Sequence, residues 1–264
     1  MPTAAVNGTN LYYHESGRGL PVVLVHGFPL DHRIWQKQAH DLAPVCRVIT
    51  PDLRGFGKSP GGGSLTIASL AEDLYLLLQQ IHALPCVLGG LSMGGYVALA
   101  YERHYASTLR GLMLIDTRAA NDTPEGRAGR ESMIELAKTG GSTAVAEKML
   151  PKMLAGGKVD GPPEVVAHIK SIMESCPSET IQHALAAMRD RIDYRPTLGR
   201  IAAPTLIITG DSDVIVQPVE SEEMHKAIRG STLSVIPGAG HMAPMEQPQL
   251  VSRAIRQFLV SLGS

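Results

Sequence analysis

The chain has 264 residues, of which 44% are hydrophobic and 19% are charged, and its formal net charge is -1. This composition is typical of a soluble globular enzyme and excludes a strongly basic surface for nucleic acid or an anionic membrane. The cysteines, Cys46, Cys86 and Cys176, are too few, and odd in number, for a disulfide framework. The N-terminus has no signal-peptide pattern and no apolar run could span a bilayer, so we expect a cytoplasmic protein without nucleic-acid or membrane partners.

Strand and helix signals alternate in the first half of the chain. Asn7-Gly8 separates two short apolar runs and predicts an opening hairpin. Later, an apolar stripe at helical spacing predicts a helix that begins with a capping box of Ser69 and Glu72. Short, continuous apolar runs predict strands buried on both faces at 21–25, 45–50, 86–88 and 112–115. Strands that alternate with helices in this way form a parallel sheet.

The alternation stops near residue 118. Between residues 119 and 195 the sequence contains helix-like stretches separated by glycine and proline, and no buried strand is predicted. Strand signals return at 205–209 and 232–236, and a last amphipathic helix is predicted over 250–262. We therefore predict one core, formed by residues 1–118 and 196–264, and a helical lid, formed by residues 119–195.

A short motif lies between the strand at 86–88 and a helix-like run. Gly90, Ser92 and Gly94 form the pattern G-x-S-x-G in this strand-turn-helix context. Small residues on both sides of the serine allow a sharp turn, which exposes its hydroxyl near the positive end of the helix. Ser92 is therefore the candidate nucleophile.

Candidate partners of Ser92 follow the carboxyl ends of other strands, where open α/β sheets bind their ligands. Asp213 follows the strand at 205–209, and His241 follows the strand at 232–236. A serine hydroxyl needs a base, and the base needs an orienting acid. The chain order serine, aspartate, histidine is the order expected when a nucleophile elbow lies on such a sheet.

With these motifs in this order, the chain resembles the α/β-hydrolase family over essentially its full length. The resemblance implies an α/β fold: a mostly parallel central sheet flanked by helices, with an inserted helical lid. It also implies that Ser92 is the nucleophile, His241 the base and Asp213 the acid. The family's glycine-x-x-aspartate pattern falls on Gly210 and Asp213.

Two other aspartates are rivals for the role of the acid. Asp211 lies too early in its turn and is expected to bind loop backbone. Asp116 ends the strand at 112–115, and some members of the family take their acid from that strand. We place both behind Asp213.

The oxyanion hole is expected to use the backbone N–H groups of Phe28 and Met93. Gly27, Phe28, Met93 and Met242 are the predicted substrate contacts, because methionine gives an adaptable apolar lining. His26 is expected to brace the oxyanion loop and not to transfer protons. The histidines and cysteines show no metal-ligand spacing, so we predict neither a metal nor a cofactor.

Acyl transfer to water through an acyl-enzyme is the natural chemistry of such a triad. We predict a carboxylesterase for small to medium acyl groups, acting on a small-molecule ester as a monomer or small homo-oligomer. The alternative is a lactonase for a 3-oxoadipate enol-lactone-like or acyl-homoserine lactone substrate, because the elbow and Asp116-Thr117-Arg118 look similar to enol-lactonase-like members. Arg118, Arg127 or Arg130 could then hold a substrate carboxylate. A cofactor-free perhydrolase, a C–C bond hydrolase and a non-catalytic ligand receptor are further alternatives.

Overall fold

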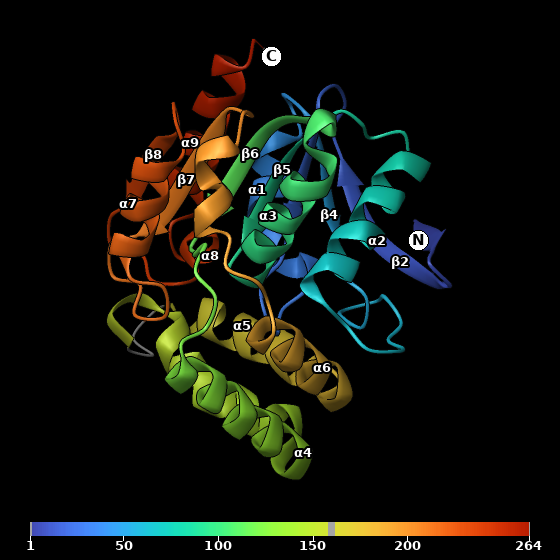
Figure 1. Ribbon diagram of the computed structural model, residues 1–264, viewed down its shortest axis with the longest axis vertical. Coiled ribbons are helices and arrows are strands. Elements are labelled where there is room, and N and C mark those ends of the chain that lie inside the picture. The colour runs from blue at the N-terminus through green and yellow to red at the C-terminus, as the bar shows by residue number, and fades with distance from the viewer. Residues whose placement is uncertain (1, 158–161, 264) are drawn as a thin grey trace.

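A central sheet of eight strands organises the molecule, with strand order β1-β2-β4-β3-β5-β6-β7-β8 (Figure 1). The computed structural model describes residues 2–157 and 162–263, so Met1, Ser264 and residues 158–161 of the predicted lid lie outside the described residues. The strands are β1 (Thr3–Val6), β2 (Thr9–Ser16), β3 (Pro21–Val25), β4 (Arg47–Pro51), β5 (Cys86–Leu91), β6 (Leu109–Ile115), β7 (Thr205–Gly210) and β8 (Thr232–Ile236).

The pairing of the strands is mostly parallel, as predicted. Strands β3 to β8 pair in parallel, while the opening hairpin of β1 and β2 is antiparallel and joins the sheet through β4. The predicted hairpin around Asn7-Gly8 is confirmed, with Val6 opposite Thr9. The fully buried strands β5 and β7 show why these segments read as continuous apolar runs, since helices cover both faces of the sheet.

Helices cover the two faces of this sheet. One face packs against α2 (Ile67–Gln80) and α3 (Met93–Tyr105), and the other packs against α1 (Gln36–Leu42) and α9 (Pro248–Ser261). Trp35, at the end of η1 (His32–Trp35), is fully buried in the second of these cores. Two further core helices are α7 (Pro218–Ala227), between β7 and β8 in the chain, and the short α8 (Ala243–Glu246), before α9. The predicted α/β fold is confirmed.

The capping box of α2 differs from the prediction. Thr66 is the N-cap, and its hydroxyl accepts a hydrogen bond from the backbone N–H of Ser69 at 2.9 Å. The hydroxyl of Ser69 in turn accepts the N–H of Thr66 at 3.0 Å. The prediction that Ser69 itself caps the helix with Glu72 was wrong, because Thr66 supplies the same chemistry three residues earlier.

In the described residues, the part of the chain that connects β6 to β7 forms a separate layer of three α-helices. They are α4 (Pro124–Met153), α5 (Pro163–Ser175) and α6 (Ser178–Arg189), and Figure 1 shows them together beyond one end of the sheet. Gly141, with φ of 68° and ψ of -168°, breaks α4 into two helical segments. Residues 119–157 and 162–195 contain no strand. The division into a core and a lid stays our proposal for how the chain is organised.

Hydrogen bonds tie this inserted layer to several loops of the core. The guanidinium of Arg33 donates to the hydroxyl of Ser175 at 2.8 Å, and the hydroxyl of Thr180 donates to the carbonyl of Gly55 at 3.0 Å. The backbone N–H of Gly156 donates to the carbonyl of Ser212 at 3.1 Å. The insertion is thus held against the loops that follow β3, β4 and β7.

None of the helices in residues 2–157 and 162–263 combines the length and the apolar character needed to cross a membrane. The cytoplasmic location stays a prediction.

Candidate active site

Ser92 lies on a strained turn between β5 and α3. Its φ of 53° and ψ of -113° place it in a backbone conformation that side chains rarely adopt. The turn is possible because Gly90 and Gly94 flank it: a Cβ on Gly90 would lie 2.0 Å from the carbonyl oxygen of Gly94, and a Cβ on Gly94 would lie 2.5 Å from that of Val25. Ser92 occupies the N-cap of α3, but its hydroxyl makes no capping bond there. The hydroxyl is therefore available to another partner.

That partner is His241. The Nε2 atom of His241 lies 2.9 Å from the Oγ of Ser92, and its Nδ1 lies 2.8 Å from the Oδ2 of Asp213. His241 and Asp213 are almost fully buried, whereas Ser92 is partly exposed. The structure thus brings Ser92 together with His241, which lies 149 positions later in the chain, and with Asp213, which lies 28 positions before His241.

The carboxylate of Asp213 is held by the loop that carries it. Its Oδ1 accepts the backbone N–H of Ile215 at 2.7 Å and that of Val216 at 3.0 Å, which leaves Oδ2 to face the imidazole. Hydrogen bonds to both oxygens of the carboxylate fix its orientation toward the imidazole. Asp211 points elsewhere and accepts the N–H of Gly238 at 3.0 Å, as expected of a residue that binds loop backbone.

Asp116 is fully buried and makes no hydrogen bond to His241 among the described residues. Its Oδ1 accepts the N–H of Gly210 at 2.8 Å, while its Oδ2 is buried without a hydrogen-bond partner in the described part of the chain. Burial, reinforced by the charge of Asp213, raises the pKa of Asp116 well above its ordinary value. Asp116 is thus a carboxyl group that the fold favours in its neutral form.

The Asp116→Asn variant is expected to gain stability relative to the wild type as the pH rises. The folded wild type keeps a proton that the unfolded chain releases above about pH 4, so its free energy of unfolding falls as the pH increases from there to the folded pKa. Asparagine does not titrate and tolerates the φ of 43° at this position.

Urea denaturation at about pH 5 and about pH 8 measures this difference, which should shift toward the variant at the higher pH. The matched control is Asp122→Asn. Arg130 and Arg191 hold the pKa of Asp122 below its ordinary value, so the loss of this carboxylate should lower the free energy of unfolding. A pH-independent difference for Asp116→Asn would show that Asp116 is ionised in the folded protein.

The backbone groups predicted to form the oxyanion hole lie beside Ser92. Met93 is the first residue of α3, so its N–H has no acceptor within the helix. A Cβ on Gly27 would lie 3.3 Å from the Cβ of Ser92, which places the chain at Gly27 and Phe28 against the serine. The side chains of Met93 and Met242 are fully buried and that of Phe28 is almost so. Substrate contact by these residues stays a prediction.

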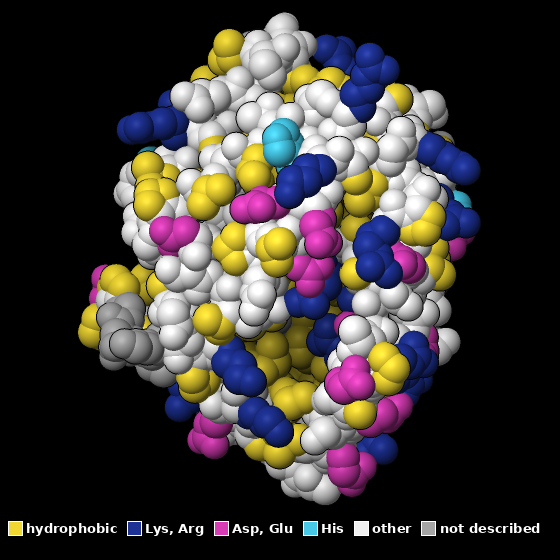
Figure 2. Space-filling model, turned by 60° about the vertical axis from the view of Figure 1, so that its left-hand side comes forward, with side chains coloured by type: hydrophobic (Ala, Val, Ile, Leu, Met, Phe, Trp, Pro, Cys, Tyr) yellow, Lys and Arg dark blue, Asp and Glu magenta, His cyan; other side chains and the backbone are white. Residues whose placement is uncertain are grey.

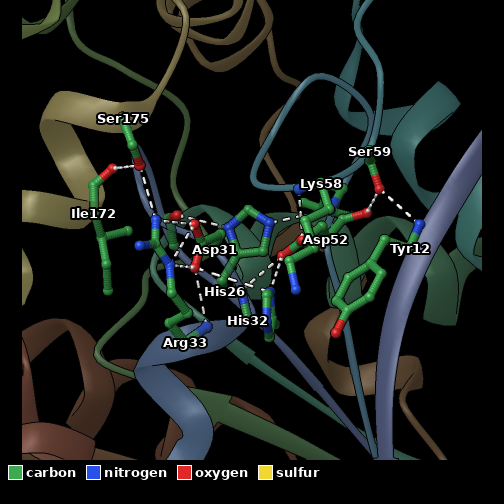
Figure 3. A network of polar contacts seen from close by, with 12 residues as sticks. Tyr12, His26, Asp31, His32, Arg33, Asp52, Lys58, Ser59, Ile172 and Ser175 are labelled. Atoms are coloured by element: carbon green, nitrogen blue, oxygen red, sulfur yellow. Dashed lines mark hydrogen bonds and ion pairs between the residues drawn. The ribbon is translucent and has the colours of Figure 1, made fainter. Parts of the chain in front are cut away.

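His26 holds the loop that is predicted to form part of the oxyanion hole. Its Nδ1 donates to the carbonyl of Gly27 at 2.9 Å, and its Nε2 accepts the N–H of Leu53 at 3.0 Å (Figure 3). The ring is fully buried, and this burial lowers its pKa. Both nitrogens of the neutral ring are used, which leaves none for proton transfer.

Asp31, His32 and Asp52 lie close enough to one another for their side-chain atoms to share a metal ion. In Figure 3 the same atoms form a hydrogen-bond network. Both oxygens of Asp31 accept bonds from Arg33, and Oδ1 of Asp52 lies 2.7 Å from Nδ1 of His32. The other oxygen of Asp52 accepts the N–H of Lys58 at 2.8 Å. The group therefore has a structural explanation, and the absence of a metal or cofactor stays a prediction.

The three arginines considered for a substrate carboxylate have protein partners. Arg118 forms an ion pair with Glu220 at 3.1 Å and donates to the carbonyl of Ile215. Arg127 forms an ion pair with Asp190 at 2.9 Å, and Arg130 forms one with Asp122 at 3.1 Å. The same two aspartates also pair with Arg189 and Arg191, respectively. These guanidinium groups are engaged in fixing loops and helices.

Thr117 contacts the elbow and was missed by the sequence analysis. Its hydroxyl donates to the carbonyl of Ser92 at 2.8 Å, and the N–H of Ser92 donates to the carbonyl of Ile115 at 2.9 Å. Together these bonds hold both backbone polar groups of the strained residue. In the sequence Thr117 follows a strand end and is part of the segment Asp116-Thr117-Arg118, and neither signal predicts this contact.

Figure 2 shows a hollow on one face of the molecule, where the inserted helices meet the core. Hydrophobic side chains form its base, and basic and acidic side chains stand at its rim.

Comparison with known proteins identifies relatives along nearly the whole chain. Residues 22–254 match the Alpha/beta hydrolase family. A thermophilic esterase from Thermogutta terrifontis, solved with malate bound, shares 42% sequence identity and superposes with a TM-score of 0.94, covering 99% of this chain and 97% of that one. The enol-lactonase from Burkholderia xenovorans LB400 shares 28% identity with a TM-score of 0.91, covering 98% of this chain and 100% of that one.

A relative of similar length is the AB hydrolase superfamily protein YisY of Bacillus subtilis, which is 30% identical over 259 residues. The match covers 94% of this chain and 94% of YisY. The sheet, the turn at Ser92 and these matches lead to one conclusion. The chain belongs to the α/β-hydrolase family.

Proposed function

We propose that the protein is a carboxylesterase that hydrolyses uncharged esters of small to medium acyl groups through Ser92, His241 and Asp213. The observation that carries the proposal is the continuous path of hydrogen bonds from the Oγ of Ser92 through the imidazole to a buried carboxylate. The esterase and enol-lactonase among its structural neighbours support hydrolysis of a carboxylic ester bond.

The reaction would proceed in two acyl transfers. The Oγ of Ser92 attacks the ester carbonyl while Nε2 of His241 takes its proton, and Asp213 stabilises the imidazolium through Nδ1. The backbone N–H groups of Phe28 and Met93 bind the developing oxyanion. His241 then protonates the leaving alcohol, which departs and leaves an acyl-enzyme. Water repeats the sequence, with His241 as its base, and releases the carboxylic acid and free Ser92.

An ester is favoured over an anionic lactone by the state of the arginines. Arg118, Arg127 and Arg130 are paired with carboxylates, so a substrate carboxylate would have to compete with Glu220, Asp190 or Asp122 for them. An uncharged lactone, such as an acyl-homoserine lactone, is the second candidate, because it carries no carboxylate that would need a free arginine.

A pair of substrates that differ only in charge tests this preference. The mono-p-nitrophenyl ester of adipic acid carries a free carboxylate, and its methyl ester is neutral and of similar length. We expect kcat/KM for the neutral substrate to be at least about tenfold higher, since burying an unpaired carboxylate in an apolar site is costly. A preference for the anionic member would contradict the proposal and favour an enol-lactonase-like substrate. An N-acyl-homoserine lactone in the same assay tests the second candidate.

A further inference from the structure

One carboxylate joins the loop of His241 to the end of the inserted helix α4. Glu246 is the last residue of α8 (Ala243–Glu246). Its Oε2 accepts the backbone N–H of Gly240 at 2.8 Å, and its Oε1 accepts the backbone N–H of Ala155 at 2.7 Å. Gly240 directly precedes His241, and Ala155 follows the C-cap of α4.

The two segments that Glu246 joins lie in direct contact. A Cβ on Gly240 would lie 2.4 Å from the carbonyl carbon of Leu154 and 2.5 Å from the backbone nitrogen of Ala155. The main chain before His241 therefore packs against the main chain at the end of α4 with no room for a side chain. The next residue, Gly156, donates to the carbonyl of Ser212, beside Asp213.

The position of Glu246 is itself well fixed. The N–H groups of Met245 and Glu246 donate to the carbonyl of Met242 at 2.8 and 2.9 Å, so the short helix folds the chain back toward Gly240. Met242 is fully buried and anchors this turn. Burial raises the pKa of Glu246, whereas the N–H groups of Ala155 and Gly240 favour its charged form. Burial of this carboxylate is therefore unfavourable, and the hydrogen bonds from two main-chain N–H groups offset that cost.

We propose that Glu246 is a positioning residue: by holding the N–H of Gly240, its carboxylate fixes the main chain from which the imidazole of His241 reaches Ser92. Asp213 orients one end of the ring, but the distance from Nε2 to the Oγ of Ser92 also depends on where the main chain of His241 lies. Glu246 sets that second condition. This inference rests on the proposed function, in which His241 is the base.

The first test is the Glu246→Gln variant. An amide offers one acceptor oxygen where the carboxylate offers two, and its NH₂ group would face the N–H of Gly240 or of Ala155. We expect kcat for p-nitrophenyl acetate to fall at least about tenfold while KM changes less than about threefold, because displacement of a catalytic group by about 1 Å impairs the chemical step more than binding. The matched control is Glu222→Gln, which alters an exposed acid on α7 and should keep wild-type kcat.

Titration of active sites with a serine-directed phosphonate separates positioning from stability. A merely structural role lowers the fraction of titratable sites and leaves kcat per titrated site unchanged. Our proposal predicts that kcat per titrated site falls, and that the phosphonate reacts more slowly with Ser92. An unchanged kcat per titrated site in Glu246→Gln would overturn it. If the wild type neither hydrolysed p-nitrophenyl acetate nor reacted with the phosphonate, the proposed function itself would be overturned.

A second variant keeps the test decisive if Glu246→Gln does not fold. Glu246→Asp retains the charge but is one methylene shorter, so it cannot bond both donors, and a loss of kcat per titrated site is again expected. An unchanged kcat per titrated site in Glu246→Asp would overturn the proposal in the same way.

Discussion

The Ser92→Ala variant is expected to lower kcat/KM for an activated aryl ester by about 10⁴-fold to 10⁶-fold, the range seen when a triad nucleophile is removed. The hydroxyl of Ser92 has one side-chain partner, Nε2 of His241, so its removal takes away the nucleophile and breaks no other bond of the elbow. The backbone bonds of Ser92 to Ile115 and Thr117 remain in the variant.

Alanine also keeps the fold intact in this variant. It has the same steric limits as serine at a φ of 53°, so the cost of the strained turn is unchanged. Melting temperature should therefore stay close to that of the wild type. The matched control is Ser64→Ala, which alters an exposed serine in a loop and should retain full activity. A loss of less than about tenfold in Ser92→Ala would exclude Ser92 as the nucleophile.

The Asp213→Asn variant is expected to lower kcat by about 10³-fold to 10⁴-fold. Its side-chain oxygen can still accept the N–H groups of Ile215 and Val216, which leaves its NH₂ group opposite Nδ1 of His241. Two donors then face each other, and the imidazole turns to the tautomer that carries its proton on Nε2. That tautomer cannot accept the proton of Ser92.

The rival aspartates provide the controls for this prediction. Asp116→Asn and Asp211→Asn should each keep kcat within about threefold of the wild type, since neither side chain contacts the imidazole in the described residues. Near-full activity in Asp213→Asn, together with a large loss in either control, would transfer the acid role to that residue.

Much of the fold could be predicted because the sheet is buried on both faces. Segments such as Val22–Val25 and Leu112–Ile115 have no polar face, so their apolar runs mark them directly. The turn at Ser92 could also be predicted from the local sequence, because only glycine fits at Gly90 and Gly94. Steric requirements of this kind act on neighbouring residues and leave a local pattern.

Details that depend on contacts distant in the chain could not be predicted. The pairing of Arg118 with Glu220 joins the loop after β6 to helix α7, and in the sequence the arginine alone suggests an anion site. Glu246 stands alone as an acid after the apolar stretch Met242–Met245, but its bond to Ala155 spans 91 positions. The predicted position of the capping box was wrong because threonine and serine are both favourable N-cap residues, so residue type does not decide between Thr66 and Ser69.

Capture of an acyl group on Ser92 tests the central claim most directly. The protein is mixed with a p-nitrophenyl ester, quenched in acid within the first turnovers, digested and weighed by mass spectrometry. Our account predicts that the peptide containing Ser92 gains the mass of the acyl group in the wild type, gains none in Ser92→Ala, and gains it far more slowly in His241→Ala. Rapid ester hydrolysis with the acyl group on another residue, or with equal labelling in His241→Ala, would contradict the account.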